Sequence, residues 1–182
     1  MKTNLGILGP AGSGKGIAAR YIAKKYNYKI INLGNIVRAL AKKEHFSPKR
    51  ENLEKLQAKY SKKYGKDFVI GKALEKAKQS RMPVILDGIR KPIQAEKAKK
   101  ELKATLILVD AKPEIRFERM KIRRRKDFPK TLKEFNRIEA KENKVFNLKR
   151  TFSMVDFRAD NSNGKAYLFK QLDAIMHKIR QS

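Results

Sequence analysis

The sequence contains no cysteine and no tryptophan, and it has few acidic residues. Without cysteine the chain cannot form a disulfide framework, a thiolate metal site or a cysteine nucleophile. No apolar run approaches the ~20 residues of a membrane-spanning helix, and glycine interrupts the first residues too early for a secretory signal. The two histidines, His45 and His177, lack the spacing of metal ligands. These absences predict a soluble, cytoplasmic protein with no membrane partner.

Positive charge dominates what is present. The 182 residues include 46 Lys and Arg against 18 Asp and Glu, a formal net charge of +28. Hydrophobic residues make up 41% of the chain, which is enough for the core of one domain. The charge is spread almost evenly along the chain and is mostly lysine (32 Lys, 14 Arg). This distribution is typical of solvated helix surfaces, with a polyanion such as nucleic acid as the alternative explanation.

Short apolar segments alternate with amphipathic segments from end to end. The apolar segments predict strands at residues 3–8, 28–32, 83–87, 104–109 and 152–158. The amphipathic segments predict helices between them, including one with Ser47 as N-cap and two at 113–124 and 131–148. This alternation is typical of an α/β domain with a parallel sheet and helices on both faces. Since no repeat or linker divides the chain, we expect a single domain over residues 1–182.

A glycine-rich loop follows the first predicted strand and precedes a helix. Its residues, 9–16, read Gly-Pro-Ala-Gly-Ser-Gly-Lys-Gly and fit the phosphate-loop pattern G-x-x-x-x-G-K. Backbone N–H groups of such a loop surround a phosphate, and Lys15 can reach the outer phosphates of ATP. Gly16 and Ile17 stand where a magnesium-binding Ser or Thr is usual, so we expect Mg²⁺ to be held by water, nucleotide phosphates and a carboxylate elsewhere. The predicted ATP-binding residues are Gly9, Ala11, Gly12, Ser13, Gly14, Lys15, Gly16 and Ile17.

Asp87 is the carboxylate best placed for that role. It ends the predicted strand Val84-Ile85-Leu86. Because parallel strands end at one edge of the sheet, Asp87 should lie beside the phosphate loop. We expect it to hold magnesium, directly or through water, or to act as a base toward the acceptor.

Two further segments resemble nucleoside monophosphate kinases. The segment Gly-Asn-Ile-Val-Arg (34–38) follows the second strand, and Asp-Gly-Ile-Arg (87–90) ends the third. In that family, arginines at these places hold the acceptor phosphate. The resemblance implies an acceptor site made of Gly34, Arg38, Asp87, Gly88 and Arg90. Asn35 stands where the family pattern has Asp.

An arginine-rich segment resembles the lid of the same kinases. Five of the 14 arginines fall within residues 119–137. The resemblance implies that Arg119, Arg123, Arg125 and Arg137 clamp the nucleoside triphosphate and are catalytic together with Lys15 and Asp87. Asn161, after the last predicted strand, resembles the asparagine of a loop that helps to seat adenine.

The order of these features is similar to an archaeal-type family of adenylate-kinase-like nucleotide kinases, which are near to dephospho-coenzyme A kinases. The resemblance implies a three-layer P-loop kinase fold with strand order 2-3-1-4-5, a mobile lid at 119–137 and an acceptor-binding helical region at 34–80. It implies ATP- and Mg²⁺-dependent transfer of the γ-phosphoryl group to a small phosphorylated acceptor, a nucleoside monophosphate, by a monomer or small homo-oligomer. The alternatives are a dephospho-coenzyme A kinase acting on a ribose hydroxyl, a nucleic-acid-associated ATPase or 5′-end kinase, and a nucleotide-binding protein without transfer activity.

Overall fold

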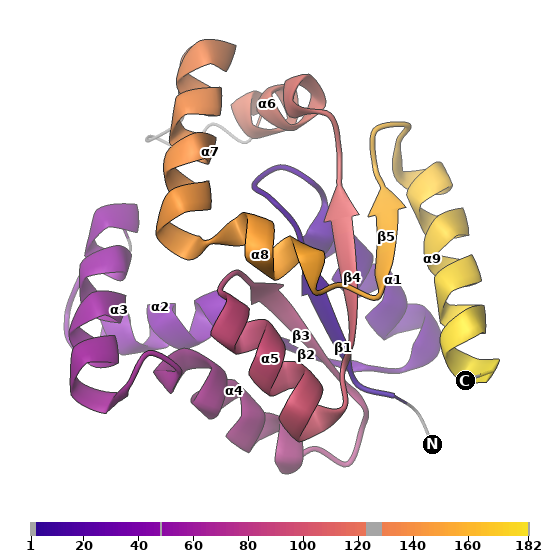
Figure 1. The fold of residues 1–182 in the computed structure, drawn as a ribbon, viewed down its shortest axis with the longest axis horizontal. Coiled ribbons are helices and arrows are strands. Elements are labelled where there is room, and N and C mark those ends of the chain that lie inside the picture. Colours follow the sequence, from indigo (N-terminus) through magenta and orange to yellow (C-terminus); the bar gives the residue numbers. More distant parts are fainter. Residues whose placement is uncertain (1–2, 48, 123–128, 182) are drawn as a thin grey trace.

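A five-stranded, all-parallel sheet forms the centre of the computed structural model, which describes residues 3–47, 49–122 and 129–181 (Figure 1). The strand order is β2-β3-β1-β4-β5, which confirms the predicted fold class and topology. Since β1 lies between β3 and β4, the loop that follows it emerges at the middle of the sheet edge. The strands are β1 (Leu5–Leu8), β2 (Lys29–Asn32), β3 (Val84–Ile89), β4 (Thr105–Asp110) and β5 (Phe157–Asp160).

Helices cover both faces of the sheet. On one face α1 and α9 pack together, and on the other lie α2, α4 and α5. Helices α6 and α7 stand beyond the carboxyl ends of the strands, at the top of Figure 1. The helices are α1 (Lys15–Tyr26), α2 (Leu33–Lys43), α3 (Arg50–Tyr64), α4 (Phe68–Lys78), α5 (Pro92–Leu102), α6 (Pro113–Ile122), α7 (Leu132–Phe146), α8 (Leu148–Ser153) and α9 (Lys165–Gln181).

The alternation of side chains along the central strand divides the core into two layers. Leu5 and Ile7 pack toward α1 and α9, whereas Leu8 packs toward α2, α4 and α5. A Cβ on Gly6 would lie 2.5 Å from the side chain of Leu106, so β1 and its neighbours pack closely only with glycine there. Because both faces of the sheet are buried, the strands are held in place, and so is the carboxyl end of β1 from which the phosphate loop projects.

The C-terminal part differs from the sequence prediction. The helix expected over 131–148 ends at Phe146, because Asn147 adopts a left-handed conformation with φ 52°. The short helix α8 follows, so the strand expected over 152–158 begins only at Phe157. The prediction was wrong because Phe152 and Met154 pack against the core from α8 and the turn after it, and not as alternating strand residues.

The start of α3 also differs. Its N-cap is Lys49, not Ser47, and the helix begins at Arg50. The Ser47 hydroxyl oxygen accepts a hydrogen bond from the Lys49 N–H at 3.4 Å, before the helix begins. The serine therefore contributes to the turn that leads into the helix.

A cluster of polar side chains joins α1 to α9 on their shared face of the sheet. The Tyr21 and Tyr26 hydroxyls and the Lys25 ammonium donate to the carboxylate of Asp173 on α9, at 2.7 to 2.8 Å. Burial alone would raise the pKa of Asp173, but the hydrogen bonds from Lys25, Tyr26 and Tyr21 outweigh it and lower that pKa. Burial and the bond to Asp173 raise the pKa of Tyr26 to about 12. We call these four residues the Asp173 cluster.

Within the described ranges, no helix has the length and apolar character needed to cross a membrane.

Candidate active site

The phosphate loop connects β1 to α1 at the carboxyl edge of the sheet. Gly12 and Gly14 have φ of 80° and 95°, in the left-handed region that favours glycine. A Cβ on Gly12 would come within 2.6 Å of the Arg116 carbonyl oxygen, so α6 packs directly on the loop. Lys15 is the first residue of α1, and its ammonium donates to the Pro10 carbonyl at 3.2 Å, which places it over the loop. The loop has the backbone geometry and the lysine that a nucleotide phosphate site requires.

The loop is supported by Asn161, which follows β5. The side chain is 1% exposed, and its Nδ2 donates to the Ser13 carbonyl at 2.7 Å. A Cβ on Gly14 would lie 2.2 Å from that same nitrogen. The Asn161 carbonyl in turn accepts from Arg119 Nη2 at 2.7 Å. Asn161 therefore joins the phosphate loop to one of the predicted lid arginines, and any contact with adenine stays a prediction.

Asp87 lies where the sequence predicts, at the edge of the sheet beside the loop. In the strand register it pairs with Ile7 of β1 and with Asn32 of β2. Asn32 Nδ2 donates to Asp87 Oδ2 at 2.6 Å, whereas Oδ1 is buried and has no hydrogen-bond partner among the residues that the structure describes. A buried carboxylate oxygen without a partner costs free energy, and the role of Asp87 toward a ligand stays a prediction.

Two asparagines hold the Arg38 guanidinium, and one of them also contacts Asp87. Arg38 Nη2 donates to Asn32 Oδ1 at 3.3 Å, and its Nε donates to Asn35 Oδ1 at 3.2 Å. A Cβ on Gly34 would lie 3.1 to 3.3 Å from Asn32 Oδ1 and from the guanidinium, so the glycine leaves room for this arrangement. Asn32 thus connects Arg38 to Asp87 through two successive hydrogen bonds.

Arg90 follows the end of β3, after a bulge at Gly88 (φ 91°). Together with Gly9–Ala11 of the phosphate loop, Arg90 lines a depression whose other wall is formed by Glu142 and Phe146 of α7. The neighbouring Lys91 is half-buried, and burial together with the nearby ammonium of Lys66 lowers its pKa. Arg90 therefore lies beside the phosphate loop, on the same segment as Asp87.

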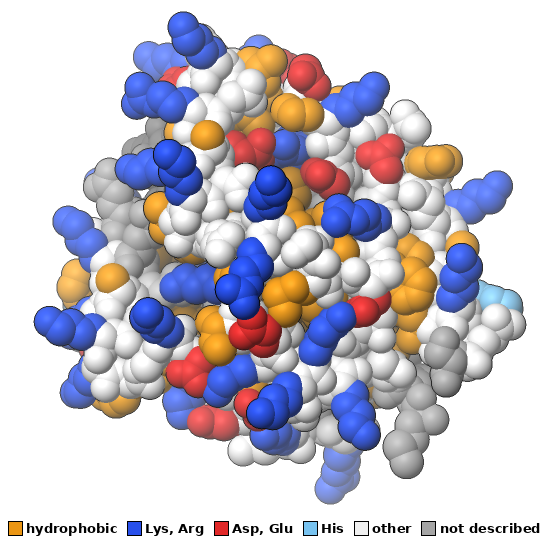
Figure 2. Space-filling view, viewed as in Figure 1, with side chains coloured by type: hydrophobic (Ala, Val, Ile, Leu, Met, Phe, Trp, Pro, Cys, Tyr) orange, Lys and Arg blue, Asp and Glu red, His pale blue; other side chains and the backbone are white. Residues whose placement is uncertain are grey.

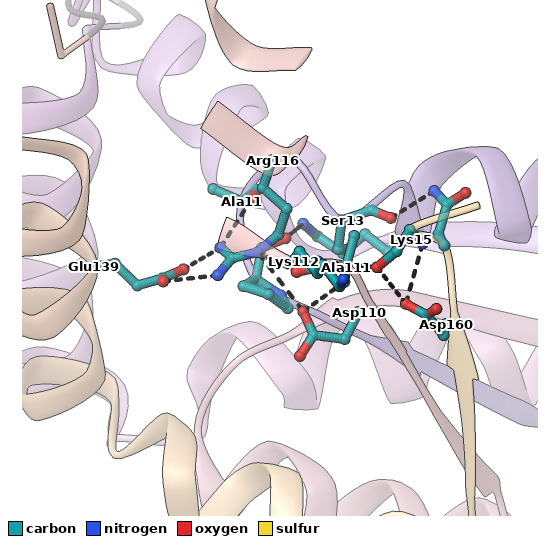
Figure 3. Close-up of polar contacts among 12 residues, drawn as sticks. Ala11, Ser13, Lys15, Asp110, Ala111, Lys112, Arg116, Glu139 and Asp160 are labelled. Atoms are coloured by element: carbon teal, nitrogen blue, oxygen red, sulfur yellow. Dashed lines mark hydrogen bonds and ion pairs between the residues drawn. The ribbon is translucent and has the colours of Figure 1, made fainter. Parts of the chain in front are cut away.

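Arg116, which the sequence analysis did not single out, is the buried arginine of this region (Figure 3). Its Nε donates to the Ala111 carbonyl at 2.8 Å, and its Nη1 donates to the Ala11 carbonyl of the phosphate loop at 3.4 Å. Both Nη atoms donate to the carboxylate of Glu139 on α7. The Arg116 guanidinium also lies over the Phe135 ring, 5.4 Å from its centroid. One side chain therefore joins the phosphate loop, the end of β4 and α7.

The structure describes two of the four predicted lid arginines, Arg119 and Arg137. Arg119 is half-buried on α6 and contacts the Asn161 carbonyl, whereas Arg137 is exposed on α7. Arg123 and Arg125 lie outside the described residues. The clamp over a nucleoside triphosphate therefore stays a prediction.

The residues present are compatible with a weakly held magnesium ion. Hard divalent cations prefer carboxylate, phosphate and water oxygens, and Asp87 Oδ1 is a buried carboxylate oxygen beside the loop. No group of three or more His, Cys, Asp or Glu able to hold a metal occurs in the described ranges. Asp87 would therefore need nucleotide phosphates and water to complete the coordination.

Comparison with known proteins agrees with this geometry. Residues 8–136 match the family described as AAA domain. A UPF0200 protein of Methanocaldococcus jannaschii is 30% identical over 178 residues, which cover 96% of this chain and 89% of the relative. The chain belongs to the AAA-domain and UPF0200 families. A second UPF0200 protein, from Staphylothermus marinus, is 25% identical over 173 residues, 95% of this chain and 90% of that relative.

Solved structures similar to this UPF0200 protein include kinases. Shikimate kinase from Acinetobacter baumannii, in complex with shikimate, has a TM-score of 0.63 and 12% identity over 98% of this chain and 93% of that chain. A gluconokinase from Sinorhizobium meliloti has a TM-score of 0.62 and 15% identity over 99% of this chain and 94% of that chain. The UPF0200 protein therefore has a P-loop kinase-like fold.

Sequence reasoning missed the residues that hold the predicted ones in place. Asn32 could have been found, because it ends the strand next to Asp87 in the predicted sheet. Arg116 and Glu139 are 23 positions apart, and nothing in their local sequence marks them as a pair.

Proposed function

We propose that this UPF0200 protein is an ATP-dependent kinase that phosphorylates a small phosphorylated acceptor, with a nucleoside monophosphate as the substrate class. The observation that carries the proposal is the chain of hydrogen bonds from Asp87 through Asn32 to Arg38. Arg90, which follows Asp87 in the chain, lines a depression together with the phosphate loop. Arg38, which shares Asn32 with Asp87, and Arg90 suit an anionic acceptor, because guanidinium groups bind phosphate in a bidentate manner.

In this proposal the loop residues 9–16 bind the triphosphate through backbone N–H groups, and Lys15 contacts its outer phosphates. Arg38 and Arg90 hold the acceptor phosphate in line with the γ-phosphorus. An oxygen of the acceptor phosphate forms a new bond to that phosphorus while the bond to the β–γ bridging oxygen breaks, giving ADP and a diphosphate product. Mg²⁺ bound to the nucleotide would neutralise charge on the phosphates, with Asp87 orienting its water ligands.

The lid residues complete the charge stabilisation in this proposal. Arg119 and Arg137, with Arg123 and Arg125, would neutralise the charge that spreads over the equatorial oxygens in the transition state. Closure of the 119–137 segment would exclude water and suppress ATP hydrolysis.

A hydroxyl acceptor, as in dephospho-coenzyme A kinases, is favoured by one observation. Asp87 Oδ1 has no hydrogen-bond partner among the described residues, so it could accept the proton of an attacking hydroxyl. The nucleic-acid alternative gains no support from the face in Figure 2, on which Lys and Arg side chains are scattered and not gathered into one track.

The test is ADP release with a panel of nucleoside monophosphates and dephospho-coenzyme A. We expect turnover with at least one monophosphate, and we expect Arg90→Ala to raise the KM for the acceptor much more than the KM for ATP. Turnover with dephospho-coenzyme A alone would support the hydroxyl acceptor. An effect of Arg90→Ala on the ATP KM alone would mean that the acceptor site is wrongly placed.

A further inference from the structure

One face of α7 carries two aromatic and two acidic side chains in the order Phe135, Glu139, Glu142, Phe146. Their spacing of i, i+4, i+7 and i+11 places them along one side of a helix. Each half of this series holds one arginine from another part of the chain. The upper half, Phe135 and Glu139, contacts Arg116. The lower half, Glu142 and Phe146, contacts Arg90.

The upper half is a rigid anchor. The side chain of Arg116 is 5% exposed, and Glu139 pairs with it through both carboxylate oxygens. Such a bidentate pair fixes the orientation of the carboxylate relative to the guanidinium as well as the distance between them. The same guanidinium donates to the carbonyls of Ala11 and Ala111. It therefore fixes the position of α7 relative to the phosphate loop (Figure 3).

The lower half is a looser contact. Arg90 Nη1 lies 3.6 Å from Glu142 Oε1, and the guanidinium lies 5.5 Å from the centroid of the Phe146 ring. The Arg90 side chain is 42% exposed, so water weakens this ion pair. The backbone around Arg90 is fixed separately, because its N–H donates to Gln94 and its carbonyl accepts from Thr151. The orientation of the Arg90 guanidinium thus depends on where α7 presents Glu142 and Phe146.

We propose that α7 is a positioning helix for Arg90, and that the Arg116–Glu139 pair sets its position from the phosphate loop. Through α7, the phosphate loop that binds ATP in the proposed function determines the orientation of the Arg90 guanidinium, which binds the acceptor. The inference rests on the proposed function for the role of Arg90. It goes beyond that function in naming Glu139, Glu142 and Arg116, none of which needs to touch either substrate.

The variant Glu139→Gln tests this coupling, with Glu134→Gln as the matched control. Both changes replace one carboxylate on α7, but Glu134 accepts from the Lys130 N–H at the helix start, a bond that glutamine can also accept. A glutamine at 139 keeps only one acceptor oxygen and no charge, so the link between α7 and Arg116 is weakened while the Arg116 bonds to Ala11 and Ala111 remain. We expect Glu139→Gln to raise the acceptor KM about tenfold, less than the roughly hundredfold that a 1 Å misplacement can cost, with the ATP KM changed by less than about twofold.

A second readout does not depend on activity. The side-chain Nε–Hε resonance of Arg90, assigned by its loss in Arg90→Lys, should shift in Glu139→Gln and not in Glu134→Gln. A shift together with a raised acceptor KM supports the proposal. An unchanged resonance overturns it, as does an acceptor KM equal to that of the control. If the wild-type protein phosphorylates no acceptor, the proposed function fails, and the resonance alone still decides whether α7 positions Arg90.

Discussion

Replacing Arg116 by methionine should destabilise the protein strongly. Methionine keeps an apolar stem against Phe135 but removes the hydrogen bonds to Ala11, Ala111 and Glu139. Removing one partner of a buried ion pair costs roughly 3–5 kcal/mol. Because the Glu139 side chain is 25% exposed, water can hydrate part of its carboxylate, and we expect about 2–3 kcal/mol.

Thermal unfolding measures this loss. A domain of this size loses about 2–4 °C of Tm per kcal/mol, so Arg116→Met should lower the Tm by about 4–12 °C. The double variant Arg116→Met/Glu139→Met also removes the Glu139 carboxylate, while the more exposed Asp110, the other carboxylate paired with Arg116, remains in both variants. It should therefore recover about 1–2 kcal/mol relative to the single variant. A Tm drop below about 2 °C in the single variant, or a double variant whose loss equals the sum of the two single losses, would show that the Arg116–Glu139 pair does not stabilise the fold.

Two further outcomes follow from the phosphate loop and from the Asp173 cluster. Gly12→Ala should weaken ATP binding more than about tenfold in calorimetry, because the φ of Gly12 is 80° and the new Cβ would meet the Arg116 carbonyl. The control is Gly71→Ala on α4, where a Cβ meets nothing within 4 Å, and this variant should bind ATP normally. Asp173→Asn should lower stability by about 1 kcal/mol at neutral pH. Since the folded-state pKa of Asp173 is lowered, its contribution is complete above about pH 5 and is lost as pH falls below about 4, so the Tm values of variant and wild type should converge in acid. A Tm gap that widens toward low pH would contradict this sign.

The sequence allowed the sheet and the phosphate loop to be predicted because both depend on local patterns. A buried apolar strand, a glycine loop and a helix start lie within residues 5–26, and the alternation of strands and helices repeats along the chain. The resemblance to nucleotide kinases then supplied the strand order, which the structure confirms.

The last strand could not be placed in the same way. Phe152 and Met154 have the spacing of a strand, but they reach the core from α8 and the turn after it. Spacing over a few residues does not distinguish these two arrangements. Asn147, which breaks the helix through its left-handed backbone, lies in a sequence with no glycine or proline nearby to mark the break.

The supporting residues of the site were out of reach for a different reason. The chain has 46 basic residues, and the local sequence does not tell which arginine is buried. Arg116 is buried because a carboxylate on α7 and two carbonyls meet it, and these come from segments distant in the chain. Only the folded arrangement distinguishes Arg116 from the solvated lysines around it.

The proposed reaction transfers a phosphoryl group from ATP to the phosphate of an acceptor held by Arg38 and Arg90. The most direct measurement follows a γ-labelled phosphoryl group from ATP into product, with a nucleoside monophosphate as acceptor, for the wild-type protein and for folded Lys15→Ala. We expect a labelled nucleoside diphosphate with the wild-type protein and none with Lys15→Ala. Label found only in inorganic phosphate or on a hydroxyl oxygen, or equal transfer by Lys15→Ala, would contradict this expectation.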